Sequence, residues 1–155
     1  TCGNGYDAFF LAPLVKKLYM LDLQAQALAN TRARLAFFTG KTALFYFCQS
    51  HENFPVKEKV NLVVYNLGYL PGGNEAVTTM TNTTLASVAQ ALEILAVRGA
   101  LSIMCYPGHP EGAVEEKALV AWASQLDNRA YQVYFYKGQD RAPALLWIVR
   151  KPLFQ

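Results

Sequence analysis

Residues 1–8 read TCGNGYDA, with glycines at positions 3 and 5 and alanine at position 8. The spacing Gly3-x-Gly5-x-x-Ala8 is typical of the turn between a strand and a helix in nucleotide-binding α/β folds, where glycines let the backbone approach a ligand. The next apolar run ends in Asp22, 17 positions after Gly5, and an acid there can accept hydrogen bonds from two ribose hydroxyls. The pattern suits NAD and S-adenosylmethionine (SAM) equally, and a tight turn with a surface aspartate is the structural alternative.

Apolar runs alternate with stretches of helical periodicity along the rest of the chain, which predicts an α/β fold. The predicted strands are 18–23, 43–48, 60–65, 101–106, 131–137 and 145–150, and the main predicted helices are 24–38, 82–96 and 115–126, with Gly99 expected to end the second helix. Such alternation is typical of a mostly parallel sheet with helices on both faces, here with a C-terminal antiparallel hairpin strand. No strand precedes the glycine turn, so we expect the natural protein to have a further segment ahead of Thr1.

Composition favours a single compact domain over residues 1–155. Hydrophobic residues make up 53% of the chain and charged residues 16%, against a typical ~25% charged, and no run reaches the roughly 18 apolar residues of a membrane span. The net charge of +3 permits an anionic partner without requiring one. The three cysteines are widely spaced, which favours a reducing, cytoplasmic setting. Cys105, His51 and His109 lack the short ligand spacing of a zinc site, so we expect no metal.

A second motif, NLGYLPGG at residues 66–73, follows the predicted strand 60–65. Open α/β sheets bind their substrates just beyond the carboxyl ends of strands. Asn66 followed by Tyr69 is similar to the Asn-Pro-Pro-Tyr motif of methyltransferases that act on amino groups, although Leu67 and Gly68 replace the two prolines. The structural alternative is a glycine turn with Tyr69 in the core. The threonine-rich residues 78–84 are either a helix start or a lip that faces the substrate.

Six segments together resemble one known family. They are TCGNGYD (1–7), LDLQ (21–24), SHEN (50–53), NLGYLPGG (66–73), TTMTNTT (78–84) and CYPGHPEG (105–112). They occur in this order in the small bacterial SAM-dependent methyltransferases named rRNA methylases, one branch of which methylates the aminomethyl group of 5-aminomethyl-2-thiouridine at the tRNA wobble position. The resemblance implies a Rossmann-like class I SAM-dependent methyltransferase fold whose first strand is missing here, SAM as cofactor, a homodimer, and an RNA partner such as the tRNA anticodon loop, with no membrane association.

The resemblance and the motifs together assign site residues. Catalytic roles are expected for Asn66 and Tyr69. Cofactor binding is expected for Gly3, Asn4, Gly5, Asp7, Asp22, Gln24, Ser50 and His51, and substrate binding for Gly68, Pro71, Tyr106 and His109. The sequence departs from the family in lacking the Asp-Ala pair that usually precedes the position of Thr1, and in having Gln49 where an aspartate is usual. An amide at position 49 can still hydrogen-bond adenine.

Three other functions stay open from the sequence. An rRNA methyltransferase would use the same residues on another RNA. An NAD(P)-dependent oxidoreductase would use the same glycine turn and Asp22, but no Tyr-x-x-x-Lys or comparable hydride-transfer pair is visible. A non-catalytic RNA-binding module would not need Asn66 and Tyr69 together.

Overall fold

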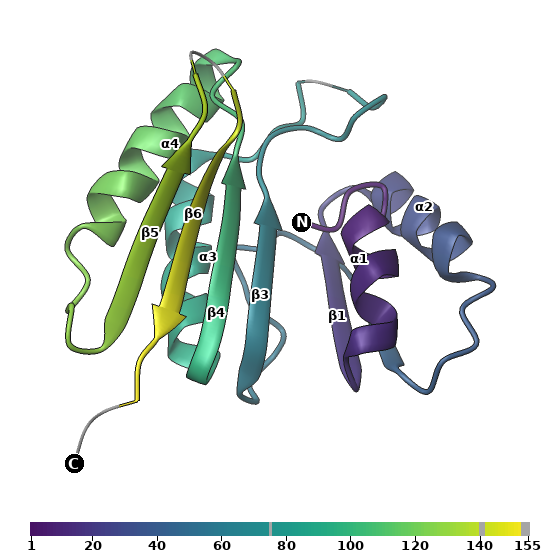
Figure 1. The fold of residues 1–155 in the computed structure, drawn as a ribbon. Helices are drawn as coiled ribbons and strands as arrows, with labels where there is room; N and C mark the ends of the chain where they lie inside the picture. The colour runs from purple at the N-terminus through teal and green to yellow at the C-terminus, as the bar shows by residue number, and fades with distance from the viewer. Residues whose placement is uncertain (75, 140–141, 153–155) are drawn as a thin grey trace.

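The computed structural model describes residues 1–74, 76–139 and 142–152. Its strands form two sheets: a parallel pair β1 (Lys17–Asp22) and β2 (Ala43–Cys48), and a four-stranded sheet in the order β3 (Val60–Asn66), β4 (Leu95–Cys105), β6 (Ala144–Arg150), β5 (Tyr131–Lys137). β3 and β4 are parallel, and β6 is antiparallel to both of its neighbours. Figure 1 shows that β6 alone among the labelled strands points downward, which confirms the C-terminal antiparallel hairpin.

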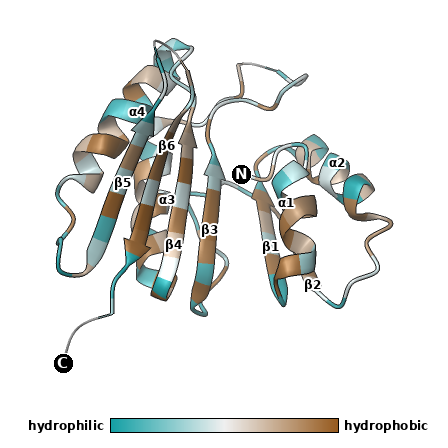
Figure 2. Cartoon of the chain, in the orientation of Figure 1, coloured by the Kyte–Doolittle hydropathy of each residue, from teal (hydrophilic) through white to brown (hydrophobic). Residues whose placement is uncertain are grey.

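Helices cover both faces, as expected. α1 (Tyr6–Leu11), which continues into the 3-10 turn η1 (Ala12–Leu14), lies in front of β1 in Figure 1 and contacts α2 (Ala25–Leu35). α3 (Thr81–Ile94) and α4 (Pro110–Ala123) lie behind the four-stranded sheet. The strands of that sheet are mainly hydrophobic (Figure 2). Alternate residues of β4 and β6 point toward these helices and form the main buried cluster, which includes Leu101, Ile103, Leu146, Ile148, Val88 and Leu119.

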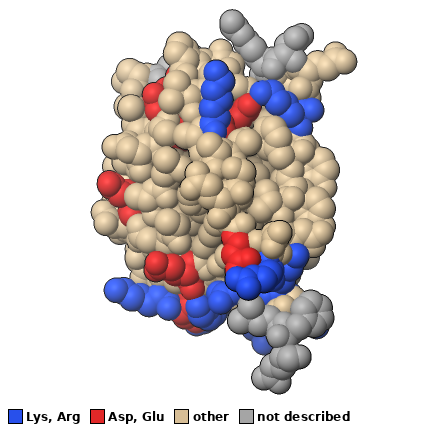
Figure 3. Space-filling model, turned by 90° about the vertical axis from the view of Figure 1, so that its left-hand side faces the viewer, with Lys and Arg blue, Asp and Glu red and all other residues tan. Residues whose placement is uncertain are grey.

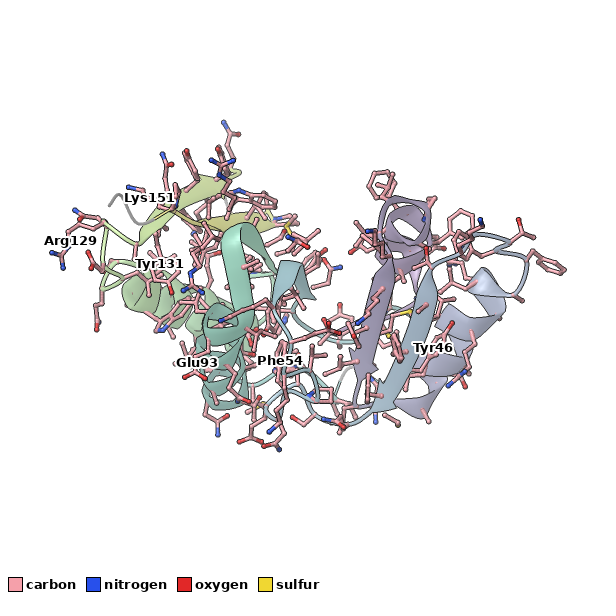
Figure 4. The ribbon with its side chains drawn as sticks, turned by 90° about the horizontal axis from the view of Figure 1, so that it is seen from below. Tyr46, Phe54, Glu93, Arg129, Tyr131 and Lys151 are labelled. Atoms are coloured by element: carbon pink, nitrogen blue, oxygen red, sulfur yellow. The ribbon has the colours of Figure 1, made fainter. Side chains whose placement is uncertain are left out.

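The two sheets lie edge to edge, with the place of one strand between β1 and β3. β1 pairs with β2 and β3 pairs with β4, and the facing edges of β1 and β3 line a cavity of about 650 Å³. Seen from below in Figure 4, Phe54 lies on the side of the four-stranded sheet and Tyr46 lies on the side of β2. Within the described part of the chain, no strand fills this place.

The first two residues already lie between β1 and β3, at their carboxyl ends (Figure 1). The Cys2 backbone N–H donates to the Leu21 carbonyl of β1 at 2.9 Å. The Thr1 hydroxyl donates to the backbone carbonyl of Asn66 and accepts from its N–H. These contacts hold the glycine turn at the carboxyl edge of the strands, where the sequence predicted the cofactor.

The prediction that Gly99 ends a helix is wrong. α3 ends at Ile94 and β4 runs through Gly99. The register between β3 and β4 shifts near Asn61, which indicates a bulge. Arg98, the residue before Gly99, has a positive φ of 64°. A Cβ on Gly99 would lie 2.8 Å from the Ala96 carbonyl oxygen of the same strand and 3.0 Å from the Asn61 carbonyl oxygen of β3. The bulge and the approach of β3 therefore both favour glycine there, and sequence periodicity does not reveal either constraint.

Candidate active site

A cavity of about 940 Å³ opens at the carboxyl ends of the parallel strands. Its volume lies at the upper end of the range for ligand pockets, so a cofactor and part of a second ligand can share it. Every site residue expected from the sequence lines this cavity except Gly5. These residues are Gly3, Asn4, Asp7, Asp22, Gln24, Ser50, His51, Asn66, Gly68, Tyr69, Pro71, Tyr106 and His109. The structure thus brings them together, while their individual roles stay predictions.

The surroundings of the two glycines in the first turn differ. Gly3 and Gly5 both have positive φ, 51° and 78°. A Cβ on Gly5 would lie 2.7 Å from the Cα of Thr31, so Gly5 allows α1 and α2 to come together. A Cβ on Gly3 would meet only Leu70, at 4.0 Å. Gly3 therefore leaves open space on the cavity, and Gly5 acts in packing rather than at the cavity wall.

Asp22 ends β1 as a buried carboxylate, 8% exposed. Its Oδ2 accepts from the Gly3 N–H and its Oδ1 accepts from the Gln24 N–H, each at 3.0 Å. A carboxylate oxygen can accept more than one hydrogen bond. Asp22 therefore has acceptor capacity left for hydroxyl groups of a ligand at the cavity.

Asn4 is bound to protein groups on both sides of the turn. Its Nδ2 donates to the Pro71 carbonyl at 3.2 Å, and its Oδ1 accepts from Asn30 at 2.8 Å. The Arg34 guanidinium donates to the Asn4 carbonyl at 2.9 Å. Asn4 therefore ties the glycine turn to α2 and to the 66–73 loop, and these contacts indicate a structural contribution beside the predicted cofactor role.

Asn66 is the last residue of β3, and its side chain contacts Asp7 of α1. The Asn66 Nδ2 donates a hydrogen bond to the Asp7 carboxylate. Because an ionised carboxylate only accepts, the amide nitrogen must face Asp7, and the carbonyl oxygen Oδ1 is left as an acceptor. Asp7, expected from the sequence to bind cofactor, is thereby placed against the predicted catalytic residue.

The 66–73 loop lies beside the start of α4, where Tyr69 is close to His109. Tyr69 is 40% exposed, and its ring centroid lies 5.8 Å from that of His109. His109 caps α4, because its Nδ1 accepts from the Gly112 N–H at 3.2 Å. That contact requires the proton on Nε2, which is buried and has no hydrogen-bond partner among the described residues. The loop therefore presents an aromatic face next to an unused N–H donor.

His51 and Ser50 also line the cavity. Burial is the main cause that lowers the pKa of His51 to about 4, so the ring is neutral near pH 7. The Ser50 hydroxyl accepts from the Glu52 N–H at 3.2 Å. Gln49, by contrast, donates its amide to the Asn53 carbonyl at 2.6 Å and is absent from the residues that line the cavity.

The sequence did not predict two buried acids of α4, Glu115 and Glu116, which are 1% and 4% exposed. Glu115 accepts hydrogen bonds from Thr79, which lines the cavity, and from Thr84. A glutamate on the apolar side of a helix is the signal that could have indicated them. α3 begins at Thr81, so residues 78–84 do start a helix, and Thr78, Thr79, Met80 and Thr83 also line the cavity.

The described residues contain no group of three or more His, Cys, Asp or Glu side chains that could hold a metal ion. Burial raises the pKa of Cys105, one of the three residues considered for zinc, to about 12, which keeps its thiol protonated. None of the described helices has the length and apolar character needed to cross a membrane.

Comparison with known proteins identifies the family. The model of the family described as "Putative rRNA methylase" matches residues 18–150. The chain belongs to this family. It is also 35% identical over 168 aligned residues to the Arabidopsis thaliana protein "tRNA (mnm(5)s(2)U34)-methyltransferase, chloroplastic", an alignment that covers 97% of this chain and 61% of the plant protein.

Solved structures of similar sequences share the fold. A putative rRNA methylase from Clostridium thermocellum superposes with a TM-score of 0.91 at 29% identity, covering 97% of this chain and 85% of the other. A putative methyltransferase from Streptococcus mutans, in complex with S-adenosylhomocysteine (SAH), gives 0.87 at 34% identity, with the same coverage of both chains. This chain therefore has the class I SAM-dependent methyltransferase fold expected from the sequence.

Proposed function

We propose that the protein is a SAM-dependent RNA methyltransferase that methylates an amino nitrogen, the aminomethyl group of 5-aminomethyl-2-thiouridine at the tRNA wobble position. The observation that carries this proposal is the Asn66 amide, oriented by Asp7 so that Oδ1 is left to accept a hydrogen bond within the cavity that Asp22 and His51 also line. The name of the plant relative and the SAH in the S. mutans structure support it. The chain spans 61% of the plant relative, so its substrate and activity are carried over here only as a proposal.

The residues around the glycine turn fit SAM. The buried Asp22 carboxylate keeps acceptor capacity for two ribose hydroxyls, and the open space at Gly3 lets a ligand approach the turn. Ser50 and the neutral His51 offer groups for the adenine. When bound, SAM supplies a methyl group on a positively charged sulfur, which an amine lone pair can attack.

Methylation of an amine depends mainly on alignment. The nitrogen must be neutral to attack, so an alkylammonium would first release a proton to solvent. The new N–C bond would then form as the sulfur–methyl bond of SAM breaks, which leaves neutral SAH and the methylated product as an ammonium. The Asn66 Oδ1 would accept an N–H of the amine and direct its lone pair, while the partly exposed Tyr69 ring would stack on the base. Orientation of this kind can supply a large share of a rate enhancement.

His109 would select the base that carries the amine. Its Nε2–H is buried, unpaired among the described residues, and beside Gly68, where an ideal Cβ would lie 3.8 Å from Nε2. A uracil oxygen or sulfur is an acceptor suited to such a donor. An anticodon loop is single-stranded, so a wobble base can enter the cavity without opening a duplex.

Few phosphate contacts are expected. In Figure 3, which shows the side formed by β5 and α4, lysines and arginines gather at the two ends with acidic residues among them, and a wide uncharged area separates them. A broad basic face for a long RNA is not visible on that side. A compact loop held by a few phosphates fits better, and its binding should weaken as salt rises. A homodimer and a cytoplasmic location remain predictions, and the plant relative is named as chloroplastic.

Two measurements test this function. Calorimetry with SAM and with NADH should show binding of SAM only, whereas binding of NADH would favour an oxidoreductase. SAM with a deuterated methyl group is then incubated with the protein and with either tRNA that carries 5-aminomethyl-2-thiouridine or ribosomal RNA. Label in the wobble nucleoside supports the proposal, and label in ribosomal RNA alone contradicts the substrate.

A further inference from the structure

Glu115 is a buried acid that the proposed chemistry does not use. It lies on α4, is 1% exposed, and belongs to none of the ion pairs found among the described residues. Burial of a carboxylate costs several kcal/mol unless other groups satisfy it. Here the compensation comes from two hydroxyls: Thr79 donates to Oε2 at 2.9 Å and Thr84 donates to Oε1 at 2.5 Å. Burial raises the pKa of Glu115, and the two hydroxyls oppose that rise.

The Thr79 contact leads to the substrate side of the cavity. The Thr79 hydroxyl accepts from the Gly68 N–H at 2.8 Å, and the Thr79 N–H donates to the Gly68 carbonyl at 3.0 Å. Gly68 has a φ of 107° and stands between Asn66 and Tyr69. Because Glu115 takes the hydroxyl proton of Thr79, the hydroxyl oxygen is oriented to accept from Gly68.

The Thr84 contact leads to the cofactor side. The Thr84 Oγ1 lies 3.4 Å from the Nε2 of His51. The single hydroxyl proton of Thr84 is directed to Glu115, so His51 must donate to Thr84 from Nε2. A neutral ring with its proton on Nε2 has an acceptor at Nδ1.

We propose that Glu115 is a positioning residue that sets both sides of the cavity through two threonines. Through Thr79 it holds the loop that carries Asn66 and Tyr69. Through Thr84 it holds His51 in the Nε2–H tautomer, so that Nδ1 can accept from a donor such as the adenine amino group. The identity of the two ligands rests on the proposed function, but the hydrogen-bond network does not.

Isosteric variants separate the contact of Glu115 with Thr79 from its contact with Thr84. Thr84→Val removes the hydroxyl next to His51, and Thr79→Val removes the hydroxyl next to Gly68. Glu115→Gln keeps the shape but leaves one acceptor oxygen for two hydroxyls. Glu116→Gln is the matched control, since Glu116 is also buried on α4 but contacts Lys137 of β5. Circular dichroism confirms that each variant is folded.

The first readout is the tautomer of His51 in the ligand-free protein, from nitrogen chemical shifts of the ring by NMR. The wild type and Glu116→Gln should show Nε2–H alone, and Thr84→Val should show a mixture of both tautomers. SAH affinity, measured by calorimetry, should fall by about 3- to 10-fold in Thr84→Val and stay within 2-fold in Thr79→Val. Turnover at saturating SAM should fall by about 10-fold in Thr79→Val and by less than about 3-fold in Thr84→Val.

If Glu115 had a merely structural role, both threonine variants would be less stable, but the loss of SAH affinity in one and the loss of turnover in the other would not be separated. An unchanged tautomer and unchanged SAH affinity in Thr84→Val would overturn the proposal, and so would equal losses of affinity and turnover in both threonine variants. If the wild type bound no SAH, the proposed function would fail, while the tautomer would still decide the network. If it bound SAH but methylated no tRNA, only the substrate assignment would fail.

Discussion

The Asn66 amide nitrogen donates to the Asp7 carboxylate, which joins the end of β3 to the first turn of α1. This contact decides which end of the Asn66 amide is left for a substrate. Without Asp7 the amide could rotate by half a turn and present a donor, which cannot bind an amine N–H. We therefore expect Asp7 to orient Asn66, and its predicted contact with the cofactor stays a prediction.

Asn66→Ala should reduce turnover by about 100-fold and leave SAH affinity within a few-fold, because a lost alignment acts on rate. Asp7→Ala should reduce turnover by about 10-fold with the same unchanged affinity. If Asp7 acts through Asn66, the double variant should be no slower than Asn66→Ala. A large loss of SAH affinity in Asp7→Ala would instead support its assignment to the cofactor site.

Asp22→Asn should weaken SAH binding by roughly 10- to 150-fold, since a hydrogen bond to a charged group is worth ~1.5–3 kcal/mol. The substitution keeps the shape of the side chain but leaves one acceptor oxygen for the Gly3 and Gln24 N–H groups, so circular dichroism first checks that the variant is folded. Asp127→Asn is a control, because Asp127 pairs with Arg129 outside the cavity. Calorimetric affinity equal to wild type in a folded Asp22→Asn protein would refute the ribose assignment.

Gly5→Ala should destabilise the protein by more than about 2 kcal/mol, because the new Cβ would lie 2.7 Å from the Thr31 backbone as well as at a φ of 78°. Gly72 has nearly the same φ, 79°, with no atom within 4 Å of an added Cβ. Gly72→Ala should therefore show the conformational cost alone, about 1–2 kcal/mol. Denaturant unfolding measures both, and equal losses would argue against the packing account of Gly5.

Stability should fall as the pH drops from 7 to 5. The folded protein keeps His51 neutral with a pKa of about 4, against an unfolded value of 6.5, so the unfolded chain binds more protons between these values and stability rises with pH there. The contribution of His51 is about 2 kcal/mol over this range. Comparison of denaturant unfolding for wild type and His51→Gln isolates it, because other titrating groups are shared. Parallel pH profiles for the two proteins would contradict the buried, neutral histidine.

Periodicity predicted the strands well, because alternation between apolar and helical segments reflects burial within each element. The strands predicted at 43–48 and 131–137 match β2 and β5. It failed at Gly99, where an added Cβ would lie close to the carbonyl oxygens of Ala96 in β4 and Asn61 in β3. Backbone contacts of this kind, like the contact of Gly5 with Thr31 of α2, are set by the folded chain and are not visible in the periodicity of a single sequence.

For the candidate site, too, local motifs were predictable from the sequence and contacts between distant segments were not. Motifs located Asp22, Asn66 and His51, because the carboxyl ends of parallel strands meet at one edge of the sheet. The pairing of Asp7 with Asn66 and the burial of Glu115 depend on side chains from distant segments, which only the folded chain brings together.

Nucleoside mass spectrometry on a strain that lacks the gene tests the central claim most directly, because it reads the whole protein's substrate in the cell. We expect 5-aminomethyl-2-thiouridine to accumulate in tRNA while its methylated form disappears, with ribosomal RNA unchanged. Restoring the gene should restore the methylated nucleoside, and the Asn66→Ala form should not. Unchanged wobble nucleosides together with a methyl group missing from ribosomal RNA would contradict the account.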